Sequence, residues 1–355
     1  MNKVIYIFTK TNWSEPPRIR HQVTNMLIKR GYEVYFFQKP TIRIKNLKER
    51  KENLVLLSTF ELIHHQLRFI SPLIWLNKLL VKWNIKNISK DEPKPDVIIN
   101  FNYDYYFLKE LYPNVKIVNI INDDFIEMAK PWMKKLAKEQ LHKTCLNGDE
   151  TLTVSYPLEK QLLKFTDNVH LFFPWAGQRY QNHGAEKVKD TVLWWGYIRH
   201  NIDWDTIEYL LKKGVKIRMV GPIMKAKNID QYIEQLQKYD NFELQASTSL
   251  DKLNFDDICC SLLSYRKDVE IKKGITISNR GFNLLSNGIP LVYVNLPELI
   301  EAPVQVITKC DSKEDYLNAV KYFQNNWNEA QPYIKDFLEG HYEEDRYEKL
   351  KSFIN

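Results

Sequence analysis

Cysteine is scarce in this chain of 355 residues, which has only four. The four are Cys145, Cys259, Cys260 and Cys310. Their positions show none of the paired spacings that a zinc site or a disulfide framework requires. We therefore expect all four to be reduced and structural, and we expect no metal site.

Long apolar runs are missing as well. The N-terminus has too short an apolar run for a signal peptide, and no small-residue cleavage site follows it. The most apolar stretch, residues 62–81, is interrupted by histidine, arginine, proline and lysine, so crossing a bilayer would be costly. We expect a cytoplasmic protein without a transmembrane helix.

Glycine-rich phosphate loops are also absent. No G-x-G-x-x-G follows the first predicted strand, and no G-x-x-x-x-G-K-[ST] or G-x-S-x-G occurs. These absences argue against dehydrogenases, P-loop NTPases and hydrolases with a nucleophile elbow. The net charge of +7 favours anionic partners in general. Because no zinc finger, RNA-binding motif or basic recognition helix accompanies the charge, we expect no nucleic-acid partner.

The pattern that is present is an alternation of short apolar runs with amphipathic segments, which is typical of parallel strands joined by helices. In the first half it predicts strands over 4–8, 32–37, 54–57, 97–101, 116–121, 152–155 and 169–173, and helices over 18–30 and 131–146. After a polar stretch at 177–190 it predicts strands over 191–195, 216–220, 258–263 and 291–294, and helices over 204–213, 228–239 and 278–287. Residues 313–355 are expected to be helical. The sequence therefore predicts two α/β domains joined by a linker.

The segment 71–90 mixes apolar, aromatic and basic side chains, including Trp75, Trp83 and Lys86. It could lie on a membrane surface. The commoner arrangement, which we favour, is a helix that buries its apolar stripe in its own domain and keeps its lysines outside.

Ligands of open α/β sheets bind beyond the carboxyl ends of the strands. In the second half this rule selects the loops 196–201, 221–225, 264–267 and 277–280. Ser278 or Asn279 can cap the helix that follows, and Arg280 in its first turn would suit a diphosphate. Arg199 could add a second contact. The alternative is that both arginines are surface residues paired with acidic neighbours.

In the first half, the loop 9–17 leads into a helix that carries Arg20 and His21, and a strand ends at Asn122, Asp123 and Asp124. We expect both loops to face the same cleft. His21, Asp123 or Asp124 could there take a proton from a hydroxyl. The alternative is that an aspartate only caps the following helix.

Four segments of the second half carry a family resemblance: VLWWGYI at 192–198, IRMVGP at 217–222, FDDICCSLLSY at 255–265 and NRGFNLLSNGIPLV at 279–292. They resemble the donor domain of bacterial GT-B glycosyltransferases, especially the sugar transferases of capsule, lipopolysaccharide and other surface-glycan pathways. The last segment is the most specific, since it looks like the donor-binding helix, its glycine and the next strand. Residues 20–34, 122–124, 150–163 and 340–346 are similar more loosely.

The resemblance implies the α/β fold of GT-B enzymes, with two Rossmann-like domains facing a cleft. Residues 1–176 would bind the acceptor, residues 191–339 would bind the donor, and 340–355 would pack back on the N-terminal domain. The implied activity is a metal-independent, hexosyltransferase-like glycosyl transfer from a nucleotide-diphosphate sugar to a glycan or lipid-linked acceptor in surface-polysaccharide synthesis. The donor is a substrate, and no cofactor is implied. Peripheral contact with the cytoplasmic face of the inner membrane is compatible with this role.

In that family the donor helix begins with a basic residue near the diphosphate, here Arg280, and carries a glutamate for the ribose, here replaced by Asn283. Ile275 and Asn283 stand where the large retaining family has an E-x7-E pair, so retention does not carry over. The donor-binding set is Gly196, Arg199, Gly221, Tyr265, Ser278, Asn279, Arg280 and Asn283. A GT-B-fold sugar-nucleotide epimerase and a non-catalytic two-lobed sugar-binding protein remain as alternatives.

Overall fold

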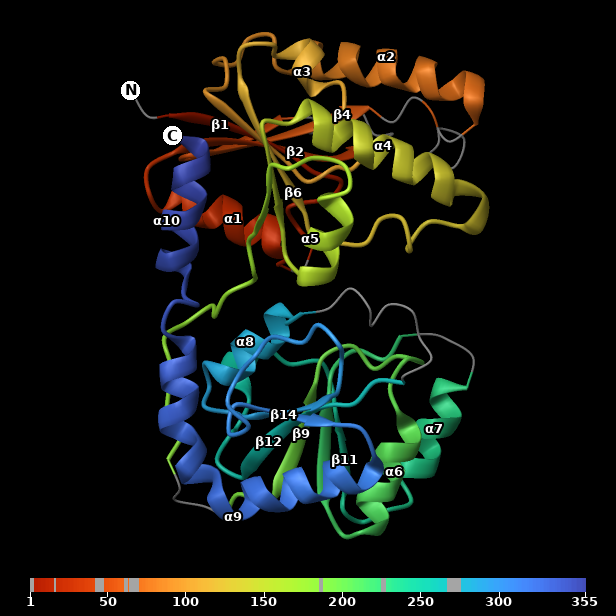
Figure 1. The fold of residues 1–355 in the computed structure, drawn as a ribbon, viewed down its shortest axis with the longest axis vertical. Helices are drawn as coiled ribbons and strands as arrows, with labels where there is room; N and C mark the ends of the chain where they lie inside the picture. The colour runs from red at the N-terminus through yellow and green to blue at the C-terminus, as the bar shows by residue number, and fades with distance from the viewer. Residues whose placement is uncertain are drawn as a thin grey trace. The chain divides into compact units, whose positions relative to one another are not determined.

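The structure is a computed structural model that describes residues 3–15, 17–41, 48–60, 63, 70–184, 188–224, 228–266 and 276–355. Lys225, Lys267, Ile275, most of residues 62–69 and part of the expected linker fall outside these ranges. The chain divides into two compact units (Figure 1). The N-terminal unit comprises Met1–Phe173 and Tyr347–Asn355, and the C-terminal unit comprises Pro174–Arg346.

The N-terminal unit is built on a sheet whose described strands lie in the order β3-β4-β2-β1-β5-β6-β7-β8. The strands are β1 (Val4–Phe8), β2 (Glu33–Thr41), β3 (Lys48–Lys51), β4 (Leu54–Phe60), β5 (Val97–Asn100), β6 (Lys116–Ile121), β7 (Glu150–Thr153) and β8 (Val169–Leu171). All pairs are parallel except β3 with β4. Every residue of β1 is buried, as expected for a parallel strand that is covered on both faces.

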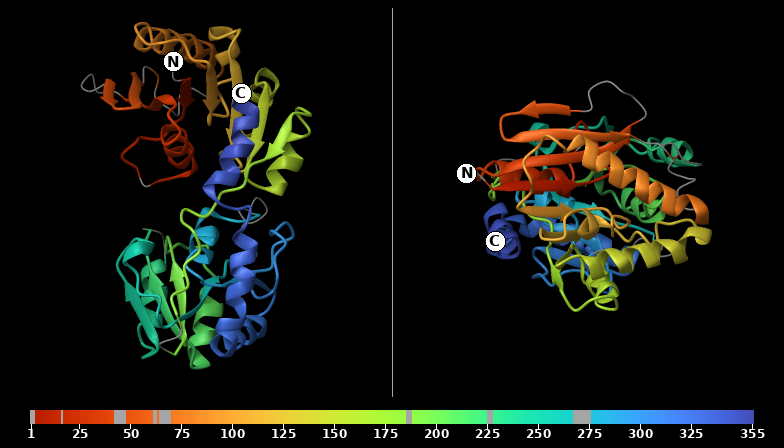
Figure 2. Two further views of the ribbon diagram at one scale, coloured as in Figure 1. Left: turned by 90° about the vertical axis from the view of Figure 1, so that its left-hand side faces the viewer. Right: turned by 90° about the horizontal axis from the view of Figure 1, so that it is seen from above.

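The helices of this unit are α1 (Ile19–Ile28), α2 (Ser71–Ile88), α3 (Leu108–Leu111), α4 (Lys134–Asn147), α5 (Tyr156–Leu162) and most of α10 (Glu343–Ile354). The connection through α1 leads outward from β1 to β2, whereas the connection through α2 leads back from β4 to β5. Because such crossovers are right-handed, the two helices lie on opposite faces of the sheet. Helices α2 and α4 run side by side (Figures 1 and 2).

The C-terminal unit has a parallel sheet with its described strands in the order β11-β10-β9-β12-β13-β14. The strands are β9 (Thr191–Trp195), β10 (Lys216–Val220), β11 (Phe242–Gln245), β12 (Ile258–Leu263), β13 (Leu291–Val294) and β14 (Ile307–Cys310), and the helices are α6 (Trp204–Lys212), α7 (Ile229–Leu236), α8 (Asn279–Leu285) and α9 (Lys313–Leu338). The strand order reverses between β9 and β12. This topological switch point is where open α/β sheets bind their ligands.

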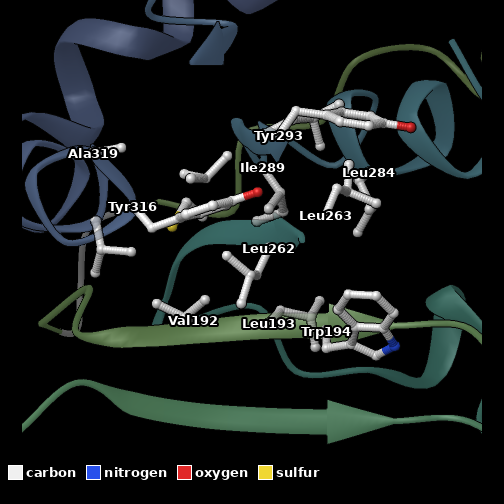
Figure 3. Close-up of a cluster of buried hydrophobic side chains, with 14 of the residues drawn as sticks. Val192, Leu193, Trp194, Leu262, Leu263, Leu284, Ile289, Tyr293, Tyr316 and Ala319 are labelled. Carbon is white, nitrogen blue, oxygen red and sulfur yellow. The ribbon is translucent and has the colours of Figure 1, made fainter. Parts of the chain in front are cut away.

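A buried cluster fixes the strands at the switch point (Figure 3). It joins Trp194 of β9 and Leu262 of β12 to Leu284 of α8 and Tyr316 of α9, all of them at most 3% exposed. Such close-packed side chains leave the backbone little freedom to shift. The loops that leave β9 and β12 therefore start from well-defined positions.

The predicted pair of α/β units is confirmed, and the bounds of β1, β6, β9, β10, β12 and β13 agree with the sequence prediction. Strands β3, β11 and β14 were not predicted. The stretch 313–355 forms two helices, α9 with an irregularity at Asn326 and then α10. All four cysteines are buried, and none of them forms a disulfide.

Candidate functional site

Two glycines shape the loops at the switch point of the C-terminal unit. Gly196 has φ +134° and Gly221 has φ +156°, and the Gly196 N–H donates to the Val220 carbonyl at 2.9 Å. A Cβ atom on Gly221 would lie 1.9 Å from the Gly196 carbonyl oxygen, and one on Gly196 would lie 2.7 Å from Nη1 of Arg280. Only residues without a side chain let the two loops and Arg280 approach one another this closely.

Replacing Gly221 by alanine is therefore expected to lower the free energy of unfolding by about 3 kcal/mol or more, since left-handed strain adds to a steric clash with backbone. Gly214→Ala is the matched control, because Gly214 has φ +82° but nothing within 4 Å of its would-be Cβ. The control should lose only about 1 kcal/mol. Urea denaturation measures both variants, and equal losses would contradict the close approach.

Arg280 occupies the position next to this turn, in the first turn of α8. Its Nη1 donates to the Trp195 carbonyl at 2.9 Å and its Nη2 donates to the Tyr265 hydroxyl. The guanidinium carbon lies 4.9 Å from the centre of the Trp194 ring and 5.6 Å from that of Tyr265. Among the described residues no acidic side chain forms an ion pair with Arg280. Its positive charge is thus held in place by aromatic faces and neutral oxygens, which leaves it available for an anion.

The other residues predicted to bind the donor differ in how exposed they are and in which groups they already bind. Ser278 is the cap of α8, since its Oγ accepts from the Gly281 N–H at 3.2 Å, and Asn279 follows it half-buried. Arg199 is exposed on the loop after β9, with its guanidinium 4.5 Å from the Tyr197 ring centre. Asn283 already accepts from the Gly177 N–H at its Oδ1, at 3.1 Å, so its NH₂ group and one remaining lone pair of Oδ1 are left for a ribose hydroxyl.

A second polar cluster lies in the N-terminal unit, where the loops after β1 and β6 meet. Arg20 connects them: Nη1 donates to Thr11 Oγ1 at 2.5 Å, and Nη2 donates to Asn122 Oδ1 at 3.3 Å. Nη2 also lies 3.7 Å from Oδ2 of Asp123. Arg20 is only 7% exposed. The two loops thus come together, and a buried arginine fixes their geometry.

Asp123 is the acidic residue that this arginine holds. Its Oδ2 accepts from Asn122 Nδ2 at 2.6 Å, and its side chain remains 42% exposed. Loss of water around the carboxyl raises its pKa above the ordinary value of 3.8, while the Arg20 charge and the Asn122 hydrogen bond oppose the rise. Asp123 is therefore an accessible carboxylate with more basic character than a free aspartate.

Asp124 and His21 are used differently. Asp124 Oδ1 accepts from the Glu127 N–H at 3.0 Å, so this residue caps the turn that follows β6. His21 is buried, its Nδ1 accepts from the Arg18 N–H at 3.1 Å, and its Nε2 lies 3.2 Å from the Asn12 carbonyl. Nε2 must then carry the proton, and burial lowers the pKa of the ring. His21 closes the first turn of α1 and has no free lone pair for a substrate proton.

Sequence reasoning did not recognise Arg20 as the residue that positions Asp123. One feature of the sequence could have indicated it. Arg20 lies in the first turn of the helix that follows β1, just as Arg280 lies in the first turn of the helix that follows β12. In the chain order Arg20 and Asp123 are far apart, and only the pairing of β1 and β6 with β5 brings them together.

Comparison with known proteins gives a fold but no family. No protein-family model matches the chain, and no curated protein matches it. Solved structures do match over its whole length. A sucrose-phosphate synthase from Thermosynechococcus elongatus superimposes with a TM-score of 0.70 at 9% identity, covering 99% of this chain and 98% of the other. A structure described as trehalose-6-phosphate from E. coli bound with UDP-2-fluoro glucose gives 0.67 at 12% identity, covering 99% of both chains.

The protein HepE from Anabaena, in complex with UDP and glucose, gives a TM-score of 0.63 at 10% identity and also covers 99% of both chains. These similarities, over nearly the full length of each chain, show that the protein has the GT-B fold. At such low identity they do not by themselves assign an activity.

Proposed function

We propose that this protein is a glycosyltransferase that takes a sugar from a nucleotide-diphosphate sugar and transfers it to a hydroxyl of a glycan or lipid-linked acceptor in bacterial surface-polysaccharide synthesis. The observation that carries the proposal is Arg280, whose charge lies at the switch point of the C-terminal unit without an acidic partner in the described residues. Two of the similar structures hold UDP or a UDP sugar, which makes UDP sugars the first donors to test.

In the proposed reaction the acceptor oxygen forms a bond to the anomeric carbon while the bond from that carbon to the diphosphate oxygen breaks. The bonding electrons leave with the diphosphate, so negative charge develops on it. Arg280, assisted by Arg199, would stabilise this charge, which makes a metal ion unnecessary in the proposal. Such fixed donors are effective because they need no reorganisation during the reaction.

The proton of the acceptor hydroxyl would pass to Asp123. Its raised pKa and exposed side chain support this role. Arg20 would act as a positioning residue, since its buried guanidinium forms an ion pair with the more exposed carboxylate of Asp123. Asp124 and His21 do not enter the proposed mechanism, because backbone groups already engage them.

The proposal is tested by incubating the protein with a panel of nucleotide sugars and measuring free nucleotide diphosphate with and without acceptors. A thermal-shift screen selects the donors first, because a ligand at 100 times its Kd adds about 2.7 kcal/mol to the stability of the folded state. We expect a UDP sugar to raise the Tm and UDP release to require an acceptor, with EDTA leaving the rate unchanged.

The other outcomes separate the alternatives. Conversion of the nucleotide sugar without any acceptor would identify an epimerase, and binding without turnover of any kind would identify a sugar-binding protein. The acceptor panel should include hexose phosphates beside oligosaccharides and lipid-linked sugars. Transfer to hexose phosphates alone would retain the transferase and overturn the surface-polysaccharide assignment.

A further inference from the structure

Helix α2 of the N-terminal unit carries large apolar side chains on its outer side. Trp75 is 66% exposed and Trp83 is 57% exposed, and Ile70, Leu76 and Leu79 are each at least 40% exposed. The spacing of 75, 76, 79 and 83 puts them on one helical face. We call Ile70, Trp75, Leu76, Leu79 and Trp83 the outer face of α2.

The other side of the helix already covers the core of its unit. Ile85 is 1% exposed and belongs to the buried cluster over β1, β2 and β4, against which Val81 and Ile88 also pack. Asn84 is 5% exposed and donates to the Phe60 carbonyl at 3.4 Å. The favoured expectation that α2 buries its apolar residues is therefore wrong for the outer face. A helix that is apolar on both sides is normally covered on both sides.

The charges that α2 and its ends carry all have one sign, and the acidic residue beside them, Glu110, belongs to α3. Residues 70–90 contain four lysines and no acidic residue. Lys78 and Lys82 lie at the edge of the helix, where each pairs with Glu110, at 2.5 and 2.7 Å. Lys86 and Lys90 are exposed at the C-terminal end of α2. A surface that combines tryptophan, leucine and lysine is typical of helices that lie in the headgroup region of a bilayer.

The neighbouring helix α4 adds more lysines to this surface than acidic residues, and its exposed Glu139 pairs with Lys143 at 2.7 Å. The Tyr106 ring lies between the two helices, with its centre 5.2 Å from Nζ of Lys78 and 5.7 Å from Nζ of Lys143. Around α4 the exposed lysines are Lys130, Lys135, Lys138 and Lys143, and Trp132, just before the helix, is 62% exposed. Figures 1 and 2 show α2 and α4 running side by side.

We propose that α2 and the basic surface of α4 bind the surface of an anionic phospholipid bilayer, with the outer face of α2 in the headgroup region. The helix has 18 residues, about 27 Å in length, and would lie parallel to the membrane. None of the helices in the described parts of the chain could span one. A second copy fits the surface less well, because a symmetric contact between two α2 helices would bring lysines of the same charge together.

Cosedimentation of the full-length protein with vesicles tests this surface directly. Vesicles of equal parts phosphatidylcholine and phosphatidylglycerol should bind it, pure phosphatidylcholine vesicles should bind it weakly, and added salt should reduce binding because it shortens the Debye length from about 10 Å at 0.1 M. The double variant Trp75→Ser/Trp83→Ser should lower the partition coefficient about tenfold or more, since apolar area in the bilayer carries the affinity.

The matched control is Val188→Ser/Val304→Ser, which removes two side chains of the C-terminal unit that are 77% and 62% exposed. It should bind vesicles like the wild type. Both double variants change exposed residues, and an unchanged Tm checks that they fold. Unaltered binding of the tryptophan variant, or no binding of the wild type to anionic vesicles, would overturn the proposal. So would a wild-type dimer that the tryptophan substitutions dissociate. Vesicle binding needs no nucleotide sugar, so this result is independent of the proposed activity.

Discussion

Arg280→Ala is expected to lower kcat/KM for the nucleotide-sugar donor by about 10²–10³-fold, the usual cost of removing one preorganised donor from a developing negative charge. The guanidinium is fixed by the Trp195 carbonyl, the Tyr265 hydroxyl and the Trp194 ring. It therefore need not be reoriented when charge develops on the leaving diphosphate. The loss should appear in both donor affinity and turnover, measured by initial rates at varied donor concentration.

Two controls separate this charge effect from a loss of structure. Tyr265→Phe removes one hydrogen bond to Arg280 and keeps the cation, so its effect should be much smaller, within about tenfold. Arg179→Ala removes an arginine of the same unit whose side chain is 64% exposed, and it should leave the kinetics unchanged. The Tm of each variant is measured alongside. If Arg280→Ala folds and keeps its donor affinity and turnover, the donor-site assignment is incorrect.

The strands that the sequence predicted best are the buried central ones. In β9 and β12 nearly every residue is apolar, because helices cover both faces of a parallel sheet. The strands that were missed have other patterns. The sequence of β3 is KERK, with all four residues exposed, and it pairs antiparallel at the sheet edge. β11 also lies at an edge and alternates polar with apolar residues. Only pairing with a neighbour makes such segments strands, and a single sequence does not show that neighbour.

The candidate site divides in the same way between local and non-local features. A cap at Ser278 or Asn279 and the position of Arg280 in the first turn of α8 follow from residues that are adjacent in sequence, and both were predicted; the structure selects Ser278 as the cap. The close approach of Gly221 to the Gly196 carbonyl, in contrast, joins the loops that follow two different strands, β10 and β9. The sequence alone does not show that these loops are neighbours. His21 is a local feature that the prediction missed. Its Nδ1 accepts from the Arg18 N–H three residues earlier, so it acts as a capping residue. Its residue type alone suggested a general base.

An arginine in the first turn of a helix appears in both units, with different results. Arg20 follows β1 and binds Thr11, Asn122 and Asp123, so the cluster around it leaves an exposed carboxylate. Arg280 follows β12 and binds only neutral groups among the described residues. The same local position therefore yields a negative site in one unit and a positive site in the other. This difference matches the two tasks of the proposed reaction, which are to accept a proton and to stabilise a leaving anion.

Asp123→Asn is expected to lower kcat by about 10²–10⁴-fold, the usual contribution of a general base. The substitution keeps the shape of the side chain, so the thermal shift that the donor produces should stay close to that of the wild type. Asp124→Asn is the matched control, one residue away. Its amide oxygen can still accept from the Glu127 N–H, so stability should change by less than about 0.5 kcal/mol while kcat stays within about twofold.

The pH dependence gives the same assignment a second readout. A base works only when it is deprotonated, so wild-type kcat/KM should fall as the pH is lowered through the pKa of Asp123. Because burial raises this pKa above 3.8, the fall should begin at a higher pH than for a free aspartate. In Asp123→Asn this acid limb should disappear, whereas Asp124→Asn should retain it. An acid limb that persists unchanged in Asp123→Asn, at a rate close to the wild type, would assign the base to another group.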